Sequence, residues 1–160
     1  MENTRQQHCI DLLQQRGASI NAIAQGVLYL QSKYHPELTI EECEEEILQV
    51  LNKHEVQNAV MLGIEIDRQS EDNRLYDPAL SQIIRSDAPL FGLDEVLAYS
   101  ICNIYGSIAL TNFGYIDKTK YGIVGVLNDD KEHCNTFIDD IVGALAAAAA
   151  SRIAHNRGEN

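Results

Sequence analysis

The sequence predicts an all-α protein, a compact bundle of about seven or eight helices around two buried helices. Apolar residues recur at helical spacing along most of the chain, and no segment alternates apolar and polar residues as a half-exposed strand does. Residues that cap or break helices separate the segments. The 160 residues, of which 45% are hydrophobic, are enough for a single helical domain over residues 1–160 with a core of its own.

The first half of the chain contains four apolar-patterned segments with clear end signals. Gly17 stops the first segment, and Ser19 can cap the second. Thr39 is followed three residues later by Glu42, which is the pattern of a capping box. The predicted helices span residues 4–16, 20–33, 40–53 and 54–68.

Three further helices are predicted in the middle of the chain. Asp77 can cap a helix that has Pro78 at its first position, and a proline-containing connector follows at 87–92. Residues 94–111 are apolar on most sides, so this helix is expected to be buried. The sequence Asn-Phe-Gly at 112–114 is expected to interrupt it. The predicted helices span residues 78–85, 94–111 and 115–127.

The last predicted helix begins near residue 135, runs to about residue 150, and is expected to be the central helix of the bundle. Thr136 can cap it, with Asp139 three residues later as in a capping box. A run of small apolar residues follows Asp139 and Asp140, so neighbouring helices can approach its backbone closely. Tight contact of this kind suits packing within one chain or a homo-oligomer, and the sequence does not distinguish the two.

Charge and composition exclude several classes of partner. The formal net charge is −12, which argues against nucleic-acid binding and allows at most peripheral contact with an anionic membrane. The four cysteines form no CxxC pair. The polar N-terminus resembles no signal peptide, and no run of about 18 apolar residues could span a bilayer. We therefore expect a cytoplasmic protein with reduced cysteines.

Three acidic features lie beside apolar helices in the second half of the chain. Each has a structural explanation, because the helix dipole favours a carboxylate at a helix start by about 0.3–1 kcal/mol. Asp117 can also pair on the surface with Lys120, three residues later. The features are Asp94-Glu95, Asp117 and Asp139-Asp140.

Helices that pack closely would bring several of these carboxylates to one place. Two anions in a partly desolvated setting repel each other unless a cation joins them. Carboxylate clusters in helical bundles bind hard cations such as magnesium, and a bound cation can polarise a phosphoryl oxygen and activate water. Among the few basic residues nearby, Lys120 is the best candidate for a phosphate contact, whereas Arg152 and His155 suit the last turn of a helix.

One rival interpretation concerns the acidic run at residues 41–46. Glu42 and Glu45 have the Glu-x-x-Glu spacing of all-α nucleoside triphosphate pyrophosphohydrolases, but no matching Glu-x-x-Asp follows downstream. A capping box with a solvated helix face explains the run better. Other phosphatase signatures, the Cys-x5-Arg loop and the GxxxxGK loop, are absent from the sequence.

The sequence resembles the phosphatidylglycerophosphatase A family over most of its length, with the motifs in residues 90–155. Three segments match the family, and the one at residues 137–144 is the most specific, because it is close to the family's Ile-Asp-Asp-Ile-Val signature. The overall pattern is similar to the soluble branch of the family, sometimes labelled low-temperature requirement protein C. The matching segments are Leu93-Asp94-Glu95-Val96, Asp117-Lys118-Thr119-Lys120 and Phe137-Ile138-Asp139-Asp140-Ile141-Val142-Gly143-Ala144.

The resemblance implies a phosphatase that uses magnesium, with manganese as a possible substitute, and converts phosphatidylglycerophosphate to phosphatidylglycerol. By position, Glu95, Asp117, Asp139 and Asp140 would be the metal ligands, Asp139 and Asp140 would be catalytic, and Lys120 would contact phosphate. The substrate would be a phosphorylated lipid or a smaller phosphate ester. Two questions stay open: whether water or a carboxylate is the nucleophile, and whether the protein is instead a non-catalytic helical module that binds a phosphorylated ligand or a partner protein.

Overall fold

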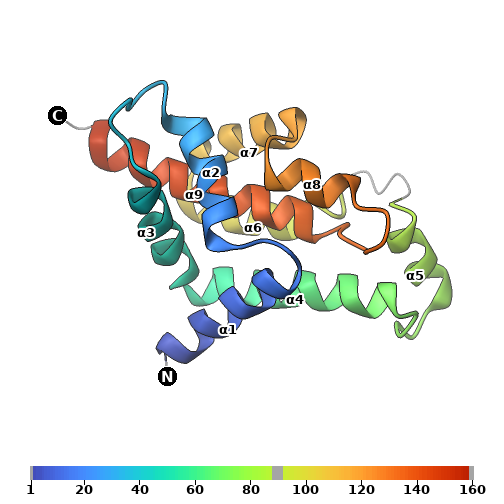
Figure 1. Cartoon of the computed structure of the whole chain (residues 1–160). Helices are drawn as coiled ribbons and strands as arrows, with labels where there is room; N and C mark the ends of the chain where they lie inside the picture. The colour runs from blue at the N-terminus through green and yellow to red at the C-terminus, as the bar shows by residue number, and fades with distance from the viewer. Residues whose placement is uncertain (1, 88–91, 159–160) are drawn as a thin grey trace.

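The structure is a computed structural model that describes residues 2–87 and 92–158. All regular elements among these residues are helices, and they number nine rather than the seven or eight predicted from the sequence (Figure 1). The predicted connector at 87–92 lies mostly outside the described residues. The helices are α1 (Glu2–Gln15), α2 (Ile20–Gln31), α3 (Ile40–Leu51), α4 (His54–Glu71), α5 (Pro78–Arg85), α6 (Val96–Tyr105), α7 (Ser107–Thr119), α8 (Ile123–Asp129) and α9 (Ile138–Gly158).

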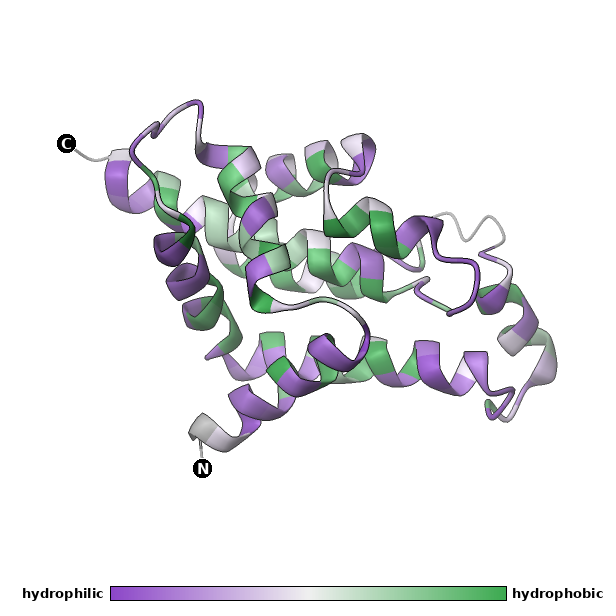
Figure 2. Cartoon of the chain, viewed as in Figure 1, coloured by the Kyte–Doolittle hydropathy of each residue, from purple (hydrophilic) through white to green (hydrophobic). Residues whose placement is uncertain are grey.

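The central element is α9, as the sequence predicts, although it extends beyond the predicted end. Every residue from 138 to 151 is buried. Figure 1 shows why: α9 runs through the middle of the molecule, and α2, α3, α4, α6, α7 and α8 all pack against it. The outer helices are polar on their outer faces and apolar toward the middle, which is clearest for α3 in Figure 2. A helix covered on all sides needs no polar stripe, which explains the unbroken run of apolar and small residues from 141 to 150 in α9.

Glycines lie at two places where a neighbouring helix packs on α9, and at Gly63 the close approach requires one, whereas at Gly143 a methyl group would make ordinary contact. A Cβ atom on Gly63 of α4 would overlap the side chain of Ile141. At Gly143 of α9, a Cβ atom would lie 3.5 Å from Ile116 and 3.6 Å from Phe113, both on α7. The expected close packing around the small residues of the last helix is therefore present within a single chain.

Most of the predicted helix ends are confirmed. Ser19 caps α2 by accepting a hydrogen bond from the N–H of Ala22. Thr39 and Glu42 form the predicted capping box of α3, and Asp77 caps α5. Each of these ends depends on residues within one turn of the helix, which is why local pattern suffices to locate it.

The predicted cap of the last helix is wrong. The hydroxyl of Thr136 donates to the carbonyl of Ile84 at 2.6 Å, and the N–H of Asp139 donates to the backbone oxygen of Asn135, so no capping box forms. The N–H of Ile138 donates instead to the carboxylate of Asp67 on α4. Thr136 is committed elsewhere because the loop before α9 packs against the end of α5.

The predicted helix over 94–111 is two helices, because Gly106 adopts φ of 90° and ends α6. Residues 112–114 were predicted to interrupt the helix, but they lie within α7, since Phe113 is buried against α9. The predicted helix over 115–127 is also divided, at Lys120 with φ of 52° and Gly122 with φ of 59°. Left-handed backbone at these positions turns the chain from α7 into α8.

The prediction of two buried helices is only half right. In α6, Ala98, Ile101 and Cys102 are buried, whereas Val96 and Tyr99 are exposed. The apolar residues that face solvent on α6 and α7 account for the misreading of this segment as fully enclosed. Within the part of the chain that the structure describes, no helix combines the length and apolar character needed to cross a bilayer.

Candidate metal and phosphate site

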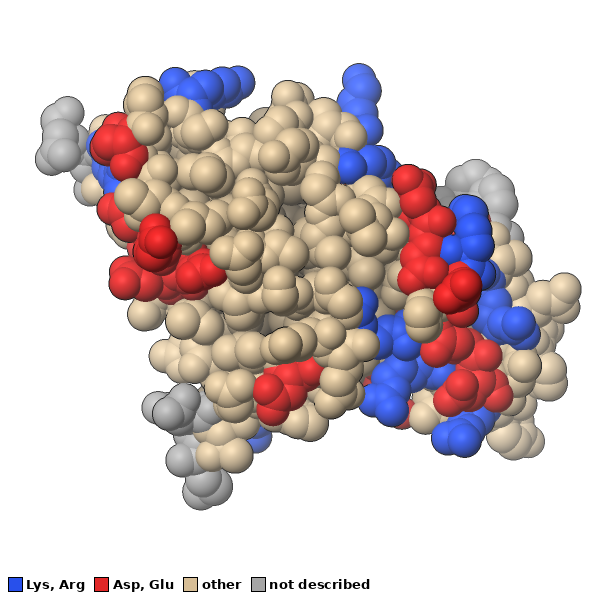
Figure 3. Space-filling view, in the orientation of Figure 1, with Lys and Arg blue, Asp and Glu red and all other residues tan. Residues whose placement is uncertain are grey.

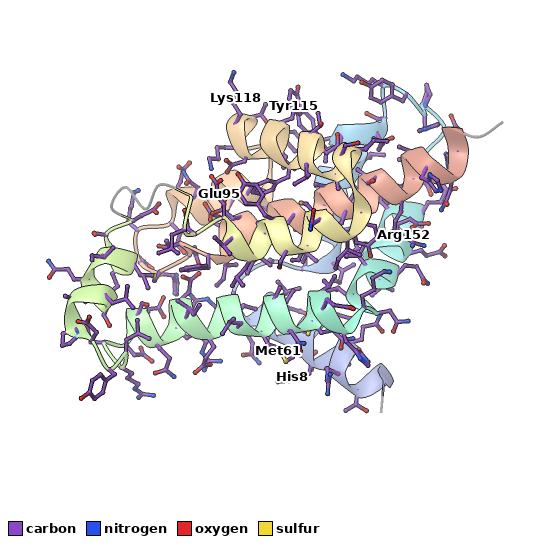
Figure 4. The ribbon with its side chains drawn as sticks, turned by 180° about the vertical axis from the view of Figure 1, so that it is seen from behind. His8, Met61, Glu95, Tyr115, Lys118 and Arg152 are labelled. Carbon is purple, nitrogen blue, oxygen red and sulfur yellow. The ribbon has the colours of Figure 1, made fainter. Side chains whose placement is uncertain are left out.

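Three carboxylates from distant parts of the chain converge at one end of the bundle. Glu95, Asp117 and Asp140 each place a carboxylate oxygen within 4.8 Å of the others. Glu95 immediately precedes α6, Asp117 lies in the last turn of α7, and Asp140 lies in the first turn of α9. Because these three helices pack against one another, the ends meet in one place, where Figure 4 shows Glu95.

Asp140 is the most deeply buried member of the cluster, with 4% of its surface exposed. Burial, together with the negative charges of Asp139, Asp94 and Asp117, raises its pKa to about 10. Burial also raises the pKa of Asp94, whose carboxyl group shares a hydrogen bond with that of Asp140. A hydrogen bond between two carboxyl groups requires that one of them be protonated, and a cation at the cluster would favour release of that proton.

Asp139 faces a different space from the other carboxylates. Its Oδ1 atom accepts a hydrogen bond from the backbone N–H of Asp140 at 2.7 Å, and its side chain lines a polar cavity of about 160 Å³. Burial raises the pKa of Asp139 to about 7 against the lowering effect of Lys120. The structure thus brings together three of the four predicted metal ligands, with Asp139 adjacent and turned to the cavity beside them.

Lys120 supplies a positive charge at the edge of the cluster. Its Nζ atom lies 2.8 Å from Oδ1 of Asp117. Burial alone would lower the pKa of Lys120, but the ion pair with Asp117 and the charges of Asp139 and Asp140 raise it above its usual value. Since one ammonium faces several carboxylates, the cluster keeps an excess of acidic groups.

The polar cavity beside Asp139 also contains basic groups that the sequence pattern did not indicate. Arg85, at the end of α5, and Lys131 and His133, in the loop before α9, line it. Arg85 is distant in sequence from Lys131 and His133, and the three show no motif, so only the fold reveals that they share a cavity. The cavity is also lined by Asp87 and Asp130, and Asp130 pairs with His133 at 2.7 Å, so Arg85 and Lys131 are the groups that can contact an anionic headgroup.

Tyr99 is a second residue that the sequence interpretation missed. Its hydroxyl donates to Oε2 of Glu95 at 2.5 Å, one helical turn away. The Glu95 hydrogen bond is also the main reason why the pKa of Tyr99 rises to about 12. The spacing of four residues was the available signal, because side chains at i and i+4 are neighbours on a helix.

The cluster fits a hard divalent cation. Its three convergent groups are all carboxylates, and oxygen ligands of this kind suit magnesium or manganese. Burial first, and then the negative charges of neighbouring carboxylates, raise the pKa of Asp140 to about 10, and a cation at the cluster would lower it. The residues therefore match the donor chemistry that the sequence resemblance implies.

The acidic run on α3 has structural partners. Glu42 completes the capping box and also accepts a hydrogen bond from Arg157 at 2.7 Å. Glu46 pairs with Arg152, so this arginine contacts a carboxylate on the opposite end of the molecule from the cluster. Glu45 is exposed. These contacts support the interpretation of the run as a helix start with a solvated face.

The fold and the cluster define an all-helical protein with convergent carboxylates at one end of a buried central helix. The chain belongs to the phosphatidylglycerophosphatase A family, whose model matches residues 11–155. This confirms the family resemblance found in the sequence motifs.

Relatives with known sequences and structures share nearly the whole chain. The uncharacterized protein YutG of Bacillus subtilis is 54% identical over 144 residues, which cover 89% of this chain and 86% of YutG. A protein of unknown function from Bacillus stearothermophilus superposes with a TM-score of 0.91 at 56% identity, covering 95% of this chain and 94% of its own. The low temperature requirement C protein from Listeria monocytogenes superposes with a TM-score of 0.93 at 49% identity, covering 99% and 100%.

Proposed function

We propose that this protein is a magnesium-dependent phosphomonoesterase that hydrolyses phosphatidylglycerophosphate to phosphatidylglycerol and phosphate. The observation that carries the proposal is the convergence of Glu95, Asp117 and Asp140 in a member of the phosphatidylglycerophosphatase A family. The three helix ends hold these carboxylates in a partly desolvated setting, where electrostatic interactions with a phosphate ester are stronger than in water.

In this proposal Glu95, Asp117 and Asp140 hold the magnesium ion, or manganese in its place. The bound ion supplies charge neutralisation for the phosphoryl oxygens and favours ionisation of water. Asp140 must release its proton for this role, and the nearby Lys120 ammonium assists by stabilising the ionised form. Tyr99 orients Glu95 through the hydrogen bond to Oε2.

Asp139 is the residue best placed to move a proton during hydrolysis. Its carboxyl group lines the polar cavity next to the cluster, and its pKa of about 7 suits proton transfer near neutral pH. We assign it as the base that accepts the proton of the attacking water, in preference to a nucleophile, because its Oδ1 atom is already bound by the N–H of Asp140. As the bond between phosphorus and the glycerol oxygen breaks, Asp139 returns the proton that it accepted to the departing oxygen.

Lys120 and the cavity residues would bind the substrate headgroup. Lys120 carries its charge beside Asp117 and so can approach a phosphoryl oxygen held at the cluster. Arg85 and Lys131 line the adjoining cavity, where they can pair with further phosphate oxygens.

The test is phosphate release from phosphatidylglycerophosphate in neutral detergent micelles, with magnesium, with manganese and with EDTA. We expect release with either metal and none with EDTA. Asp117→Asn and Asp140→Asn should each lower kcat/KM by roughly 100-fold or more, because each removes a charge at the site. Asp129→Asn, an exposed change at the end of α8, is the matched control and should behave as wild type.

Two results would overturn the assignment. Full activity in both cluster variants would remove the site from the mechanism. Magnesium binding by calorimetry, with no turnover of phosphatidylglycerophosphate or of smaller phosphate esters, would establish the alternative of a non-catalytic helical module that binds a phosphorylated ligand or partner.

A further inference from the structure

Three tyrosines from separate parts of the chain form a stack on the surface. The rings of Tyr29 and Tyr121 are stacked with centroids 3.9 Å apart and planes inclined by 4°. Tyr115 stacks on Tyr29 from another direction, at 5.9 Å, and its hydroxyl accepts a hydrogen bond from that of Tyr29 at 3.2 Å. Tyr115 and Tyr121 keep 50% and 41% of their surface exposed, so much of the stack faces solvent.

Lysines and a fourth tyrosine extend this stack into a continuous face. Lys33 lies within electrostatic range of Tyr29 and Tyr115, and its Nζ atom lies 4.9 Å from the ring centre of Tyr34, which is 64% exposed. Figure 4 shows Lys118 beside Tyr115, both pointing outward from α7. We call this surface the tyrosine face and define it by Tyr29, Lys33, Tyr34, Tyr115, Lys118 and Tyr121.

The charge of the tyrosine face is opposite to that of the whole molecule. The chain has a formal net charge of −12, yet the six residues of this face include two lysines and no acidic residue. In Figure 3 the upper edge of the molecule shows basic atoms at two places with uncharged surface between them. A protein with this distribution meets an anionic surface most favourably through this edge.

Two residues of the tyrosine face are chain neighbours of residues at the carboxylate cluster. Lys118 follows Asp117 in α7, and Tyr121 follows Lys120, whose ammonium pairs with Asp117. A hollow of about 330 Å³ opens beside Tyr29 and Tyr121, and the apolar residues Leu28, Pro36 and Leu38 contribute to its wall. A molecule held against this face would therefore contact α7, the helix that carries Asp117.

The chemistry of the face favours a lipid bilayer over a second copy of the chain. Tyrosine is enriched where proteins meet the headgroup region, because its ring is apolar and its hydroxyl is polar. Lysines near an anionic membrane add roughly 1 kcal/mol of attraction each. In a symmetric dimer the same patch meets itself, so the lysines would face a surface of like charge.

We propose that the tyrosine face docks the protein on an anionic phospholipid surface and presents the carboxylate cluster to lipid headgroups. This inference rests on the proposed function for the identity of the substrate, and it names the surface from which the substrate is taken. The lysines attract the anionic headgroups, the exposed tyrosine rings enter the interfacial layer, and the apolar hollow lies against the acyl chain region.

The test measures binding of the full chain to sedimenting vesicles, in EDTA so that no turnover occurs. Vesicles of phosphatidylcholine with phosphatidylglycerol are compared with vesicles of phosphatidylcholine alone. We expect binding to the anionic vesicles only, weakened by the double variant Tyr115→Gln/Lys118→Glu by roughly 30-fold, as expected for a change of two charge units. The matched control Arg74→Glu/Tyr76→Gln makes the same changes at exposed residues of the α4–α5 turn and should bind as wild type.

Several outcomes would overturn the docking proposal. These are no binding of the wild type to anionic vesicles, equal binding to neutral vesicles, or equal loss of binding in the test and control variants. A concentration-dependent dimer that Tyr115→Gln/Lys118→Glu converts to a monomer would assign the face to a second copy of the chain. Because the measurement needs no catalysis, absence of phosphatase activity leaves its result intact, whereas activity on micelles without vesicle binding refutes the docking alone.

Discussion

Asp67 holds the start of the central helix from a position about 70 residues earlier in the chain. Its Oδ2 atom accepts a hydrogen bond from the N–H of Ile138 at 2.9 Å, and the same carboxylate accepts from the N–H of Phe137. Asp67 is completely buried near the end of α4. This contact fixes the first turn of α9 against α4, and that turn carries Asp139 and Asp140 into the site.

We expect Asp67→Ala to lower the free energy of unfolding by about 2–3 kcal/mol, since it leaves buried N–H groups of Phe137 and Ile138 without an acceptor. For a domain of this size, the loss corresponds to a fall in Tm of roughly 5–10 °C. Asp72→Ala, an exposed change at the end of the same helix, is the control for the loss of one acidic residue.

Denaturant unfolding followed by circular dichroism measures the difference. Asp67→Asn retains one carbonyl acceptor and should recover part of the loss. Equal stability of Asp67→Ala and Asp72→Ala would show that the cap contributes nothing.

Tyr99 is expected to act as a positioning residue for Glu95. Tyr99→Phe removes the hydroxyl that donates to Oε2 of Glu95, so the carboxylate is less restricted at the cluster. We expect magnesium affinity to fall by roughly tenfold, with no loss of thermal stability in EDTA, because Tyr99 is 43% exposed and phenylalanine keeps the ring contact with Phe113. Calorimetric titration with magnesium gives the affinity.

The control lies on the same helix. The buried hydroxyl of Tyr105 has no hydrogen-bond partner among the described residues, so Tyr105→Phe removes an unpaired polar atom. It should leave magnesium affinity unchanged and be neutral or slightly stabilising. A Tyr99→Phe variant that binds magnesium as the wild type does would refute the positioning role.

Metal binding should strengthen as pH rises. The folded-state pKa values of Asp139 and Asp140, about 7 and about 10, are raised above the ordinary value, so both groups stabilise the metal-free fold at low pH. That stability is lost as pH rises through each raised pKa, because the buried groups then ionise. Magnesium must displace the proton of Asp140, its ligand in the proposed site, so magnesium affinity should rise by about tenfold per pH unit below the pKa of that group.

Thermal unfolding at pH 5 and pH 8 tests the direction of this pH dependence. In EDTA the Tm should be lower at pH 8, and added magnesium should raise it more at pH 8 than at pH 5. Asp140→Asn removes one of the titrating groups and should reduce both differences. A magnesium effect that is independent of pH would contradict proton displacement.

Local signals predicted the helices whose ends depend on neighbouring residues. Ser19, the Thr39–Glu42 pair and Asp77 each act within one turn, so their patterns were sufficient. The cap of α9 could not be predicted in this way, because the acceptor, on α4, is distant in sequence. Thr136 is a residue type that often caps helices, but its hydroxyl donates to the carbonyl of Ile84 instead.

The breaks between α6, α7 and α8 show a second limit. Gly106 ends α6 and Gly122 immediately precedes α8, whereas Gly114 lies inside α7, although the three have the same intrinsic freedom. Packing decides between them: Phe113, next to Gly114, is buried against the central helix, so continuing the helix there gains more than the glycine costs. The contact between Phe113 and the central helix cannot be inferred from a single sequence.

The sequence predicted those residues of the candidate site that lie in recognisable motifs. Glu95, Asp117 and Asp140 occur in segments that resemble the family, and the structure places their carboxylates together. Their roles and the magnesium ion stay predictions. Arg85 and Lys131 have no motif, and the cavity that they share with Asp139 follows only from the packing of α5 and the loop before α9.

The contact between Gly63 and Ile141 should be detectable as an energetic coupling between α4 and α9. Gly63→Ala adds a methyl group where the Ile141 side chain already lies, so the overlap should cost about 1–3 kcal/mol, partly offset by the better helix propensity of alanine. Ile141→Val removes the Cδ1 atom that the new methyl group would meet. In the double variant the two changes should fit together, and its destabilisation should be smaller than the sum of the single effects by about 1 kcal/mol.

Denaturant unfolding of the four proteins gives this double-mutant cycle, with Gly114→Ala on α7 as the control, because a Cβ atom there would meet nothing within 4 Å. Gly114→Ala should be neutral or stabilising and additive with Ile141→Val. Strict additivity of Gly63→Ala with Ile141→Val would mean that α4 and α9 move apart to accept the methyl group. In that case the first turn of α9 would shift with them, and Gly63→Ala alone should weaken magnesium binding at Asp140.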